Sequence, residues 1–490
     1  MTSYEDYRPA LERMAQTGEQ GLLTKEKVGF FARTSGTTGV TKRIPVVASS
    51  YLPYLRCEAI FVYLGMRVIE RSNMRRGWGL NTVETAASRT PGGIREGFIS
   101  AYAADGAKVL LSNISCMPRE AFGYGDEADM KYIKTRYALQ NPDLVFMLSV
   151  FMSTLSDLMR YIQDNHALLI RDIETGTIDP SIALPEKLRR ALEQKLKPDP
   201  ERAEFLRSVF SDSNGERLAS RLWPKLRVII AIGTGEFAPF TEKMRSYCDE
   251  QVQFCFEMYA ASEALMASAI AMEDERYLLI PDSCFFEFLP EEGEVERPLL
   301  LRDLKEGARY EVILTTRSGL YRYRIQDVIR VVGFLGRAPL VQFAYRKNQL
   351  INITGVKLTA EHLHDAIQRF SQELGTAVTD YSVYPDLTWE PWRLAVYLEL
   401  EEDPGGEELG AIFDQALAWV NEEYGRMLLV GEVSPCQIHV VPSGTYARYR
   451  AQKSRDGANV NQVKTARILD SPEQLSLLLR AVAPQEEATI

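Results

Sequence analysis

The stretch Thr34-Ser-Gly-Thr-Thr-Gly-Val-Thr-Lys-Arg43 carries more information about this chain than any other segment. It consists mostly of hydroxyl-bearing residues and glycine and ends in Lys42 and Arg43, so it has little to contribute to a hydrophobic core. The apolar run Val28–Ala32 precedes it and predicts a short buried strand. A polar, glycine-containing loop that follows a buried strand is well placed to bind a ligand.

The chemistry of this loop predicts phosphate binding. Gly36 and Gly39 permit backbone angles that turn successive N–H groups to one side, which forms an anion-binding nest. Hydroxyl and ammonium donors are added by Ser35, Thr37, Thr38 and Lys42. The spacing differs from that of a Walker A motif. The alternative interpretation is a flexible polar turn.

Size and composition predict a globular protein of two to three domains, at about 150 residues per domain. The net charge of −10 argues against nucleic acid as the main partner. The longest apolar stretch, Leu144–Leu155, is shorter than the about 20 residues of a membrane-spanning helix, so no membrane association is expected. Six scattered cysteines without a C-x-x-C pair, together with the absence of a signal-peptide pattern at the start, predict a cytoplasmic protein with free thiols.

Apolar periodicity predicts alternating helices and strands in the first half of the chain. Helices are expected at Ser49–Arg71, Met130–Gln140, Phe151–Asn165 and Pro185–Leu196. Strands are expected at Leu144–Leu148, Leu226–Ile232, Val252–Phe256 and Leu278–Pro281. This alternation predicts a largely parallel sheet.

From Cys284 to Val332 the pattern changes to closely spaced strands with glycine turns, which predicts an antiparallel or barrel-like element. After Phe343 the alternation restarts. The expected elements are a helix at Thr359–Leu374, a strand at Trp392–Leu400, a helix at Glu407–Tyr424 and a strand at Gln437–Val441. We therefore expect an N-terminal domain of residues 1–344 and a smaller α+β domain of residues 345–490, joined by a hinge near Tyr345–Thr354.

A second candidate site is Met258-Tyr-Ala-Ala-Ser-Glu-Ala264, which follows a predicted strand. Ligands of open α/β sheets bind at the carboxyl ends of strands. Tyr259 can present a ring face to a base, and Glu263 can bind Mg²⁺, a hard ion that takes one or two carboxylates together with phosphate oxygens. The alternative is a helix N-terminus with Ser262 as its cap and Glu263 in its first turn.

Two further motifs are candidates for nucleotide contacts. In Leu320-Tyr-Arg-Tyr-Arg-Ile-Gln-Asp327, the final aspartate can accept both hydroxyls of a ribose; the alternative is an ion pair with Arg322 or Arg324. Near the C-terminus, a Gly- and Asn-rich loop leads to Gln462-Val-Lys-Thr-Ala-Arg467. Its lysine, Lys464, can enter and leave a phosphate site; the alternative is a solvated tail.

The segment Gly233-Thr-Gly-Glu-Phe-Ala238 satisfies a loose dinucleotide-binding fingerprint. It follows a predicted strand, but Pro239 occupies a position where the following helix should already have begun. We therefore disfavour an NAD site. Thr234 and Gly235 can equally lie along an adenine ring.

Together these motifs resemble those of adenylate-forming enzymes, and in particular the acyl acid–amido synthetase family of plant auxin- and jasmonate-conjugating enzymes and their bacterial relatives. The resemblance extends from about residue 25 to residue 470. It is carried by Thr34–Gly39 with Lys42, Trp223–Arg227, Thr234–Glu236, Tyr259–Glu263, Tyr310–Thr316, Gly319–Asp327, Lys357 near Glu361, and Gln462–Arg467. The segment that ends in Asp327 is the most specific part.

The resemblance implies a role for each motif. Residues 35–42 would bind phosphates, Tyr259 would stack on adenine, Glu263 would bind Mg²⁺, and Asp327 would hold the ribose. Lys357 and Lys464 would approach the phosphates from the mobile domain. The nucleotide-binding set is completed by Thr234, Gly235, Ser262 and Arg324. The implied fold is α/β, with a large N-terminal domain of mixed sheets and a barrel-like element, and a small mobile C-terminal domain.

Three departures from the family pattern stand out. Gln326 replaces the glycine that usually precedes the ribose-binding aspartate, Ala466 replaces a proline, and the segment before the phosphate loop is short. The first of these puts the shape of the turn before Asp327 in doubt.

The expected reaction has two steps and uses ATP and Mg²⁺. A small carboxylic acid attacks ATP to form an acyl-adenylate, and an amine then takes the acyl group. The alternatives are transfer to coenzyme A or a carrier-protein thiol, and a protein that only binds nucleotide. Residues 87–93 and Leu148–Met152 are candidates for the acyl pocket, with core packing as the alternative for the second segment. We expect a monomer.

Overall fold

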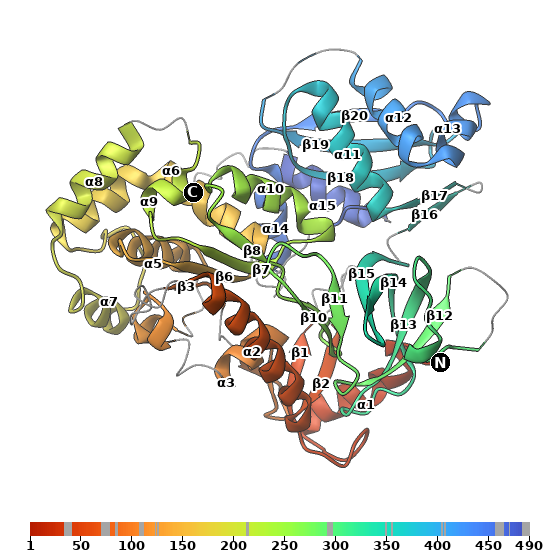
Figure 1. The fold of residues 1–490 in the computed structure, drawn as a ribbon, viewed down its shortest axis with the longest axis horizontal. Helices are drawn as coiled ribbons and strands as arrows, with labels where there is room; N and C mark the ends of the chain where they lie inside the picture. Colours follow the sequence, from red (N-terminus) through yellow and green to blue (C-terminus); the bar gives the residue numbers. More distant parts are fainter. Residues whose placement is uncertain are drawn as a thin grey trace. The chain divides into compact units, whose positions relative to one another are not determined.

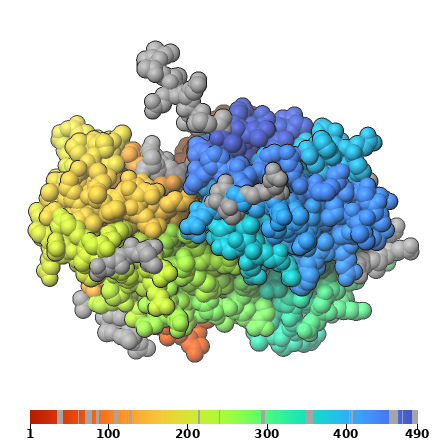
Figure 2. All heavy atoms as spheres, turned by 90° about the horizontal axis from the view of Figure 1, so that it is seen from above, coloured from red at the N-terminus to blue at the C-terminus, as the bar shows by residue number. Residues whose placement is uncertain are grey.

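The computed structural model describes all 490 residues except 34–41, 70–78, 84–86, 107–111, 123, 125–126, 212–214, 292–296, 348–349, 354–355, 403–404, 406–407, 456–464, 470 and 483–490. The chain divides into two compact units (Figure 1). Unit 1 comprises Met1–Ile325 and Arg330–Gln342, and unit 2 comprises Gln326–Ile329 and Phe343–Ile490. In Figure 2, the described C-terminal part of unit 2 is coloured cyan to blue.

The described part of unit 1 is built from helices and short strands. Its helices are α1 (Tyr4–Thr17), α2 (Tyr51–Val68), α3 (Ile99–Gly106), α5 (Glu127–Gln140), α6 (Met152–Thr175), α7 (Glu186–Glu193), α8 (Pro200–Ser211), α9 (Leu218–Leu222) and α10 (Ala238–Ser246), with 3-10 turns η1 (Ala48–Ser50), η3 (Arg119–Ala121), η4 (Gly235–Phe237) and η5 (Leu301–Asp303). Its strands are β1 (Val28–Arg33), β2 (Arg43–Val47), β3 (Gly79–Asn81), β4 (Ser88–Arg89), β5 (Arg95–Gly97), β6 (Phe146–Phe151), β7 (Val228–Ile232), β8 (Gln253–Cys255), β9 (Met258–Ala260), β10 (Leu265–Ala269), β11 (Tyr277–Leu279), β12 (Phe285–Pro290) and β13 (Arg309–Thr315). β14 (Tyr323–Leu335) and β15 (Ala338–Arg346) run through both units.

The predicted parallel sheet is confirmed. Its order is β3-β6-β7-β8, and each neighbouring pair is parallel. Figure 1 shows α2 on one side of this sheet and α10 on the other. The apolar face of α2, with Tyr54, Cys57 and Leu64, packs against Val228 and Ile230 of β7. Burial of apolar surface on both sides of the sheet explains why its strands are almost continuously hydrophobic.

The closely spaced strands after Cys284 join a larger sheet of order β12-β13-β14-β15-β11-β10-β9. The β12–β13 pair is antiparallel, as the pattern predicted. The pairs β9–β10, β10–β11 and β11–β15 are antiparallel as well, so the strand expected at Leu278–Pro281 belongs to this sheet and not to the parallel one. A third sheet, of order β2-β1-β5-β4, contains the strand that precedes the predicted phosphate loop.

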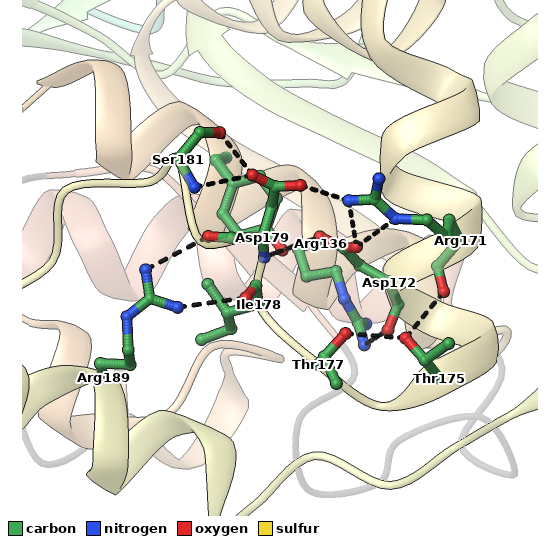
Figure 3. A network of polar contacts seen from close by, with 10 residues as sticks. Arg136, Arg171, Asp172, Thr175, Thr177, Ile178, Asp179, Ser181 and Arg189 are labelled. Carbon is green, nitrogen blue, oxygen red and sulfur yellow. Dashed lines mark hydrogen bonds and ion pairs between the residues drawn. The ribbon is translucent and has the colours of Figure 1, made fainter.

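Polar groups at the end of α6 hold the connection that leads to α7 (Figure 3). Asp172 is 1% exposed and accepts hydrogen bonds from the Tyr132 hydroxyl at 2.6 Å and from the Asp179 amide at 3.0 Å. Arg136 donates to the Asp172 carbonyl at 2.7 Å, and Arg189 donates to the Ile178 carbonyl at 3.1 Å. This cluster therefore serves the fold, because its members bind one another and the backbone of the connection.

Unit 2 is a three-stranded sheet with helices on both faces. Its strands are β16 (Leu350–Ile353), β17 (Val356–Thr359), β18 (Val378–Asp386), β19 (Arg393–Leu400) and β20 (Gln437–Val441), and its helices are α11 (Ala360–Leu374), α12 (Leu409–Val420), α13 (Glu422–Leu429), α14 (Thr445–Arg455) and α15 (Pro472–Val482). The sheet order is β18-β19-β20, while β16 and β17 form a separate pair. Alternate residues of β19 face two cores: Leu394, Val396 and Leu398 pack with α11 and α12, whereas Ala395 and Tyr397 pack with α14 and α15.

Two predicted helices differ from the structure. The helix expected at Glu407–Tyr424 is wrong as a single element, because it divides at Asn421, which leaves the helical conformation and caps α13 by accepting the Tyr424 amide at 2.8 Å. The helix expected to end at Asn165 continues to Thr175 across a kink at Asn165, whose side chain donates to the Tyr161 carbonyl at 3.0 Å. Among the described residues, no helix has the length and apolar character needed to cross a bilayer.

Candidate active site

The predicted phosphate loop connects two paired strands. Arg33, at the end of β1, lies opposite Arg43, at the start of β2. The loop residues Ser35, Gly36, Thr37, Thr38 and Gly39 themselves lie outside the described residues. The hairpin confirms the buried strand before the loop and fixes both ends of the connection.

The two cations at the base of this loop have different partners. Arg43 donates to the Glu96 carboxylate at 2.8 Å, and its amide donates to the Tyr4 hydroxyl at 3.0 Å. The Lys42 ammonium lies 5.5 Å from the centre of the Tyr4 ring, a cation–π contact.

Ser262 and Glu263 lie at the tip of the antiparallel β9–β10 hairpin, which the Ala261 amide closes by donating to the Ala264 carbonyl at 2.9 Å. The alternative of a helix capped by Ser262 is therefore wrong. Its physical reason is the sequence that follows, because every residue of Leu265–Ala269 is buried in a strand of the antiparallel sheet.

The hairpin tip lines a small pocket in unit 1. Residues from separate segments of the chain meet there: Pro45 and Val46 of β2, Tyr54 of α2, Ser262 and Glu263 of the tip, and Thr316 with Arg317 after β13. The strand that leaves the predicted phosphate loop and the predicted metal-binding carboxylate thus belong to one site.

The Tyr54 hydroxyl is the most informative atom of this pocket. Tyr54 is 7% exposed, and its hydroxyl is buried without a hydrogen-bond partner among the described residues. Burial, with a smaller contribution from the negative charge of Glu263, raises the pKa of Tyr54 far above its usual 10.0. The hydroxyl therefore stays protonated and can donate a hydrogen bond.

The donor set at this tip suits Mg²⁺. Glu263 offers a carboxylate and Ser262 a hydroxyl, both hard oxygen ligands. Within the described residues, no group of three or more His, Cys, Asp or Glu is arranged to hold a metal ion. A single carboxylate is enough for Mg²⁺, which completes its shell with water and substrate phosphates.

Thr234 and Gly235 lie just after β7, at the carboxyl end of the parallel sheet. Gly235 has a φ of 60°, and the Thr234 hydroxyl is 3.1 Å from the Tyr277 hydroxyl. The helix α10 begins at Ala238 with Pro239 in its first turn, so the proline does not obstruct it. Pro239 therefore does not exclude an NAD site, contrary to the interpretation from the sequence. The loop has the position expected for ligand binding.

Tyr259 is 8% exposed in β9. Most of its ring is therefore covered, and adenine stacking by Tyr259 stays a prediction.

Asp327 in β14 is 2% exposed and accepts a hydrogen bond from Arg346 of β15 at 2.6 Å. Its expected ion-pair partners bind other carboxylates. Arg322 donates to Glu287 at 2.9 Å, and Arg324 donates to Glu311 through two bonds of 2.7 Å each. The alternative of a pair with Arg322 or Arg324 is thus wrong, and the contacts with ribose proposed for Asp327 and Arg324 stay predictions.

The residue before Asp327 adopts a left-handed backbone conformation although it is not glycine. Gln326 has a φ of 66°, in the left-handed region that glycine favours, and its carbonyl accepts the Lys347 amide at 2.8 Å. A non-glycine residue held at positive φ marks a position that the surrounding structure enforces.

The two predicted catalytic lysines are only partly located. Lys357 lies opposite Asn352 in the β16–β17 pair, which places its backbone, while its side chain lies outside what the structure describes. Lys464 lies outside the described residues. Thr465, immediately after it, is buried.

The two acyl-pocket candidates have structural partners. The Gly92 amide donates to the Ala15 carbonyl of α1 at 2.8 Å, and a Cβ atom on Gly92 would lie 2.2 Å from the Gly18 nitrogen. In the second segment Met152 is fully buried, and Phe151 stacks on Phe237 with ring centres 4.6 Å apart. These contacts favour core packing.

Sequence reasoning missed Tyr54, Tyr277 and Arg346. Tyr54 lies three residues before Cys57 on the buried face of a predicted helix, a position that indicated packing only. For the other two no local signal existed, because their partners Thr234 and Asp327 are separated from them by 43 and 19 residues.

Comparison with known proteins agrees with these motifs along almost the whole chain. Residues 1–253 match the GH3 family N-terminal domain, residues 277–346 the GH3 family central domain, and residues 361–473 the GH3 family C-terminal domain. The chain belongs to the GH3 family. This confirms the resemblance drawn from the motifs.

Named members of the GH3 family extend over most of the chain. This chain is 28% identical to the probable indole-3-acetic acid-amido synthetase GH3.1 of Arabidopsis thaliana, and the match covers 97% of this chain and 83% of the relative. It is also 28% identical to the indole-3-acetic acid-amido synthetase GH3.8 of Oryza sativa subsp. indica, over 98% and 83%.

Solved structures bear out the fold. The GH3.15 acyl acid amido synthetase is similar with a TM-score of 0.86 and 22% identity, covering 99% of this chain and 87% of that one. The same protein in complex with 2,4-DB gives a TM-score of 0.84 and 23% identity over 99% and 87%. The expected α/β fold with mixed sheets is thereby confirmed.

Proposed function

We propose that this GH3-family protein is an ATP-dependent ligase that joins a small carboxylic acid to an amine and releases AMP and pyrophosphate. The curated relatives that extend over 97–98% of the chain are named amido synthetases. The observation that carries the proposal is the pocket that brings Glu263 together with β2, the strand that leaves the predicted phosphate loop.

The first step is attack of the substrate carboxylate on the α-phosphorus of ATP, with departure of pyrophosphate. Lys42 and the Tyr54 hydroxyl supply donors for phosphate oxygens, while Glu263 and Ser262 would hold Mg²⁺. The ion would supply charge neutralisation at the phosphates as pyrophosphate leaves. Positioning and charge compensation are the main contributions of a protein to such a step.

In the second step an unprotonated amine attacks the acyl carbon, and AMP leaves. This step requires no nucleophilic side chain. Burial raises the pKa of the Cys248, Cys255 and Cys284 thiols to about 12, so these cysteines are thiols and not reactive thiolates at neutral pH. These three cysteines therefore offer no thiolate nucleophile.

Residues 345–490 act in this proposal as a mobile domain that brings Lys464 and Lys357 to the phosphates during adenylation. Asp327 holds the ribose, Tyr259 contacts adenine, and residues 233–235 border the base. We further propose that the protein acts as a cytoplasmic monomer.

The proposal is tested with purified protein, MgATP and a panel of carboxylic acids that includes indole-3-acetic acid and 2,4-DB. ATP–pyrophosphate exchange measures adenylation, and mass spectrometry identifies products after addition of amino acids or coenzyme A. We expect acid-dependent exchange and an amide product. A thioester in place of the amide would assign the acceptor to thiols, and absence of both exchange and ATP binding would refute adenylation.

A further inference from the structure

A buried charge cluster in unit 2 is centred on Asp380, a residue of β18 whose side chain is 4% exposed. One carboxylate oxygen accepts hydrogen bonds from Arg450 at 2.7 Å and from the Thr465 hydroxyl at 3.2 Å. The other oxygen accepts from Arg467. Both arginines are themselves buried, at 7% and 3% exposure, so the cluster is closed to solvent.

The partners of Asp380 come from the two sides of one stretch of chain. Arg450 belongs to α14, which ends at Arg455, whereas Thr465 and Arg467 belong to the segment 465–469. The stretch between them, residues 456–464, lies outside the described residues and ends with Lys464. A single carboxylate therefore ties the helix before Lys464 to the residue directly after it.

The segment 465–469 is also fixed to β18 through its backbone. The Val383 amide donates to the Arg467 carbonyl and the Leu469 amide donates to the Val383 carbonyl, each at 2.8 Å. The Ser382 hydroxyl donates to the Ala466 carbonyl at 2.7 Å. The segment is thus joined to β18 by one isolated parallel bridge, Val383–Ile468, and by the Ser382 side chain.

A β-bulge between Val378 and Asp380 interrupts the register of β18 with β19. Bulges change the direction of the side chains that follow them. Unit 2 already has two hydrophobic cores, and buried ion clusters add little stability compared with apolar packing. The physical advantage of this cluster is therefore geometric, because charge-assisted bonds to two planar guanidinium groups define one arrangement.

We propose that Asp380 is a positioning residue for Lys464. It holds Thr465 and Arg467, the described residues that follow the lysine, in one defined arrangement on β18. This inference rests on the proposed function, in which Lys464 assists adenylation. Asp380 itself touches no substrate and acts only through the segment that it anchors.

The test compares Asp380→Asn with wild type in each half-reaction of the full-length protein. The asparagine keeps the shape but loses the charge that binds both arginines. Because small displacements of a catalytic group are costly, we expect adenylation in single-turnover experiments to slow on the order of tenfold to 100-fold. Amide formation from a pre-made acyl-adenylate should change much less. Equal losses in both steps would overturn the proposal.

A double variant separates positioning from a merely structural role. If Asp380 acts through Lys464, the Lys464→Ala/Asp380→Asn protein should adenylate no more slowly than Lys464→Ala alone. Independent losses that multiply would refute the inference. If the Lys464→Ala protein adenylates at the wild-type rate, Lys464 has no part in the proposed function. This single variant tests the proposed function separately from the role of Asp380.

Asp414→Asn is the matched control. Asp414 is buried in the same unit, where it accepts the Tyr424 hydroxyl at 2.6 Å, and its described partners lie outside the segment 465–469. It should lower thermal stability without selective loss of adenylation, and a selective loss equal to that of Asp380→Asn would contradict the proposal. Thr465→Val removes only one hydrogen bond of the cluster. It provides a milder variant for the same test if Asp380→Asn does not fold. We expect the same selectivity with a smaller loss, and its absence would overturn the inference.

Discussion

The pocket at Glu263 in unit 1 and the Asp380 cluster in unit 2 both bury polar groups, but they treat them differently. In the pocket the Tyr54 hydroxyl is buried without a partner among the described residues, next to a carboxylate at the tip of a hairpin. In the cluster both carboxylate oxygens of Asp380 have donors. A buried polar atom without a partner costs free energy, so a protein retains it where a ligand supplies the partner. We therefore propose the first region as the ligand site and the second as its support.

The largest expected effect concerns the carboxylate of the pocket. Glu263→Gln keeps the size of the side chain but removes the charge proposed to bind Mg²⁺. Adenylation should slow on the order of 100-fold or more, by analogy with the loss of one preorganised charge-stabilising group, and the Mg²⁺ concentration for half-maximal rate should rise. Single-turnover measurements across a Mg²⁺ series decide this. The exposed Glu275→Gln is the control, and an unchanged Mg²⁺ dependence in Glu263→Gln would end the comparison.

Asp327 tests an intermediate case, a buried carboxylate whose partner Arg346 is 37% exposed. The partly exposed guanidinium of Arg346 makes this ion pair less enclosed than the Asp380 cluster, whose arginines are 7% and 3% exposed. Asp327→Asn should weaken ATP binding by about 2–3 kcal/mol, the range for hydrogen bonds to a charged group. Calorimetry with ATP measures it. Equal affinity of the variant and the wild type for ATP would leave Asp327 with only its ion pair with Arg346.

His364 gives a pH-dependent test of unit 2. Burial, together with the positive charge of Arg467, lowers the pKa of His364 from 6.5 to about 4. Between these pH values the unfolded chain binds a proton that the folded chain does not, so the free energy of unfolding should fall as pH falls from 6.5 towards 4. The contribution is about 1.4 kcal/mol per pH unit.

Urea unfolding of the full-length protein at several pH values measures how the free energy of unfolding depends on pH. His364→Asn removes the titrating group and should flatten the dependence in this window. If the two proteins lose stability in parallel on acidification, the slope arises from other groups.

The smallest expected effects, on stability and activity, come from two tyrosines of α2. The hydroxyl of Tyr51 has a hydrogen-bond partner among the described residues, whereas that of Tyr54 has none. Tyr54→Phe removes the hydroxyl without a partner and should raise the free energy of unfolding by about 1 kcal/mol. Tyr51→Phe removes a hydroxyl that donates to the Ala103 carbonyl at 3.0 Å and should lower the free energy of unfolding by a similar amount, about 1 kcal/mol.

The rate of adenylation should be lower in the more stable variant, Tyr54→Phe, than in Tyr51→Phe. Tyr54→Phe should slow adenylation about tenfold, as expected for one hydrogen bond to the ligand, whereas Tyr51→Phe should leave it unchanged. Chemical denaturation and pyrophosphate exchange on the same preparations provide both readouts. A stabilised Tyr54→Phe protein with full activity would show that the hydroxyl does not contact the ligand.

The sequence by itself determined the features that depend on neighbours along the chain. Apolar spacing located α2, α5 and β7 to within a few residues, because burial on one face leaves a periodic record in the sequence. Thr359 and Gly375 bracket α11 for a similarly local reason, since a capping side chain and a left-handed glycine satisfy the backbone at helix ends. The order of the motifs was sufficient to indicate the family.

Only the tertiary structure decided which distant groups meet. The segment with Ser262 has the local signature of a helix start, yet it forms a hairpin because Leu265–Ala269 gains more by completing a sheet. Asp327 pairs with Arg346 and not with the nearer Arg324, whose guanidinium binds Glu311. Asp380 collects donors 70 to 87 residues away in the sequence. Such partners are chosen by strand order and burial, which local spacing does not record.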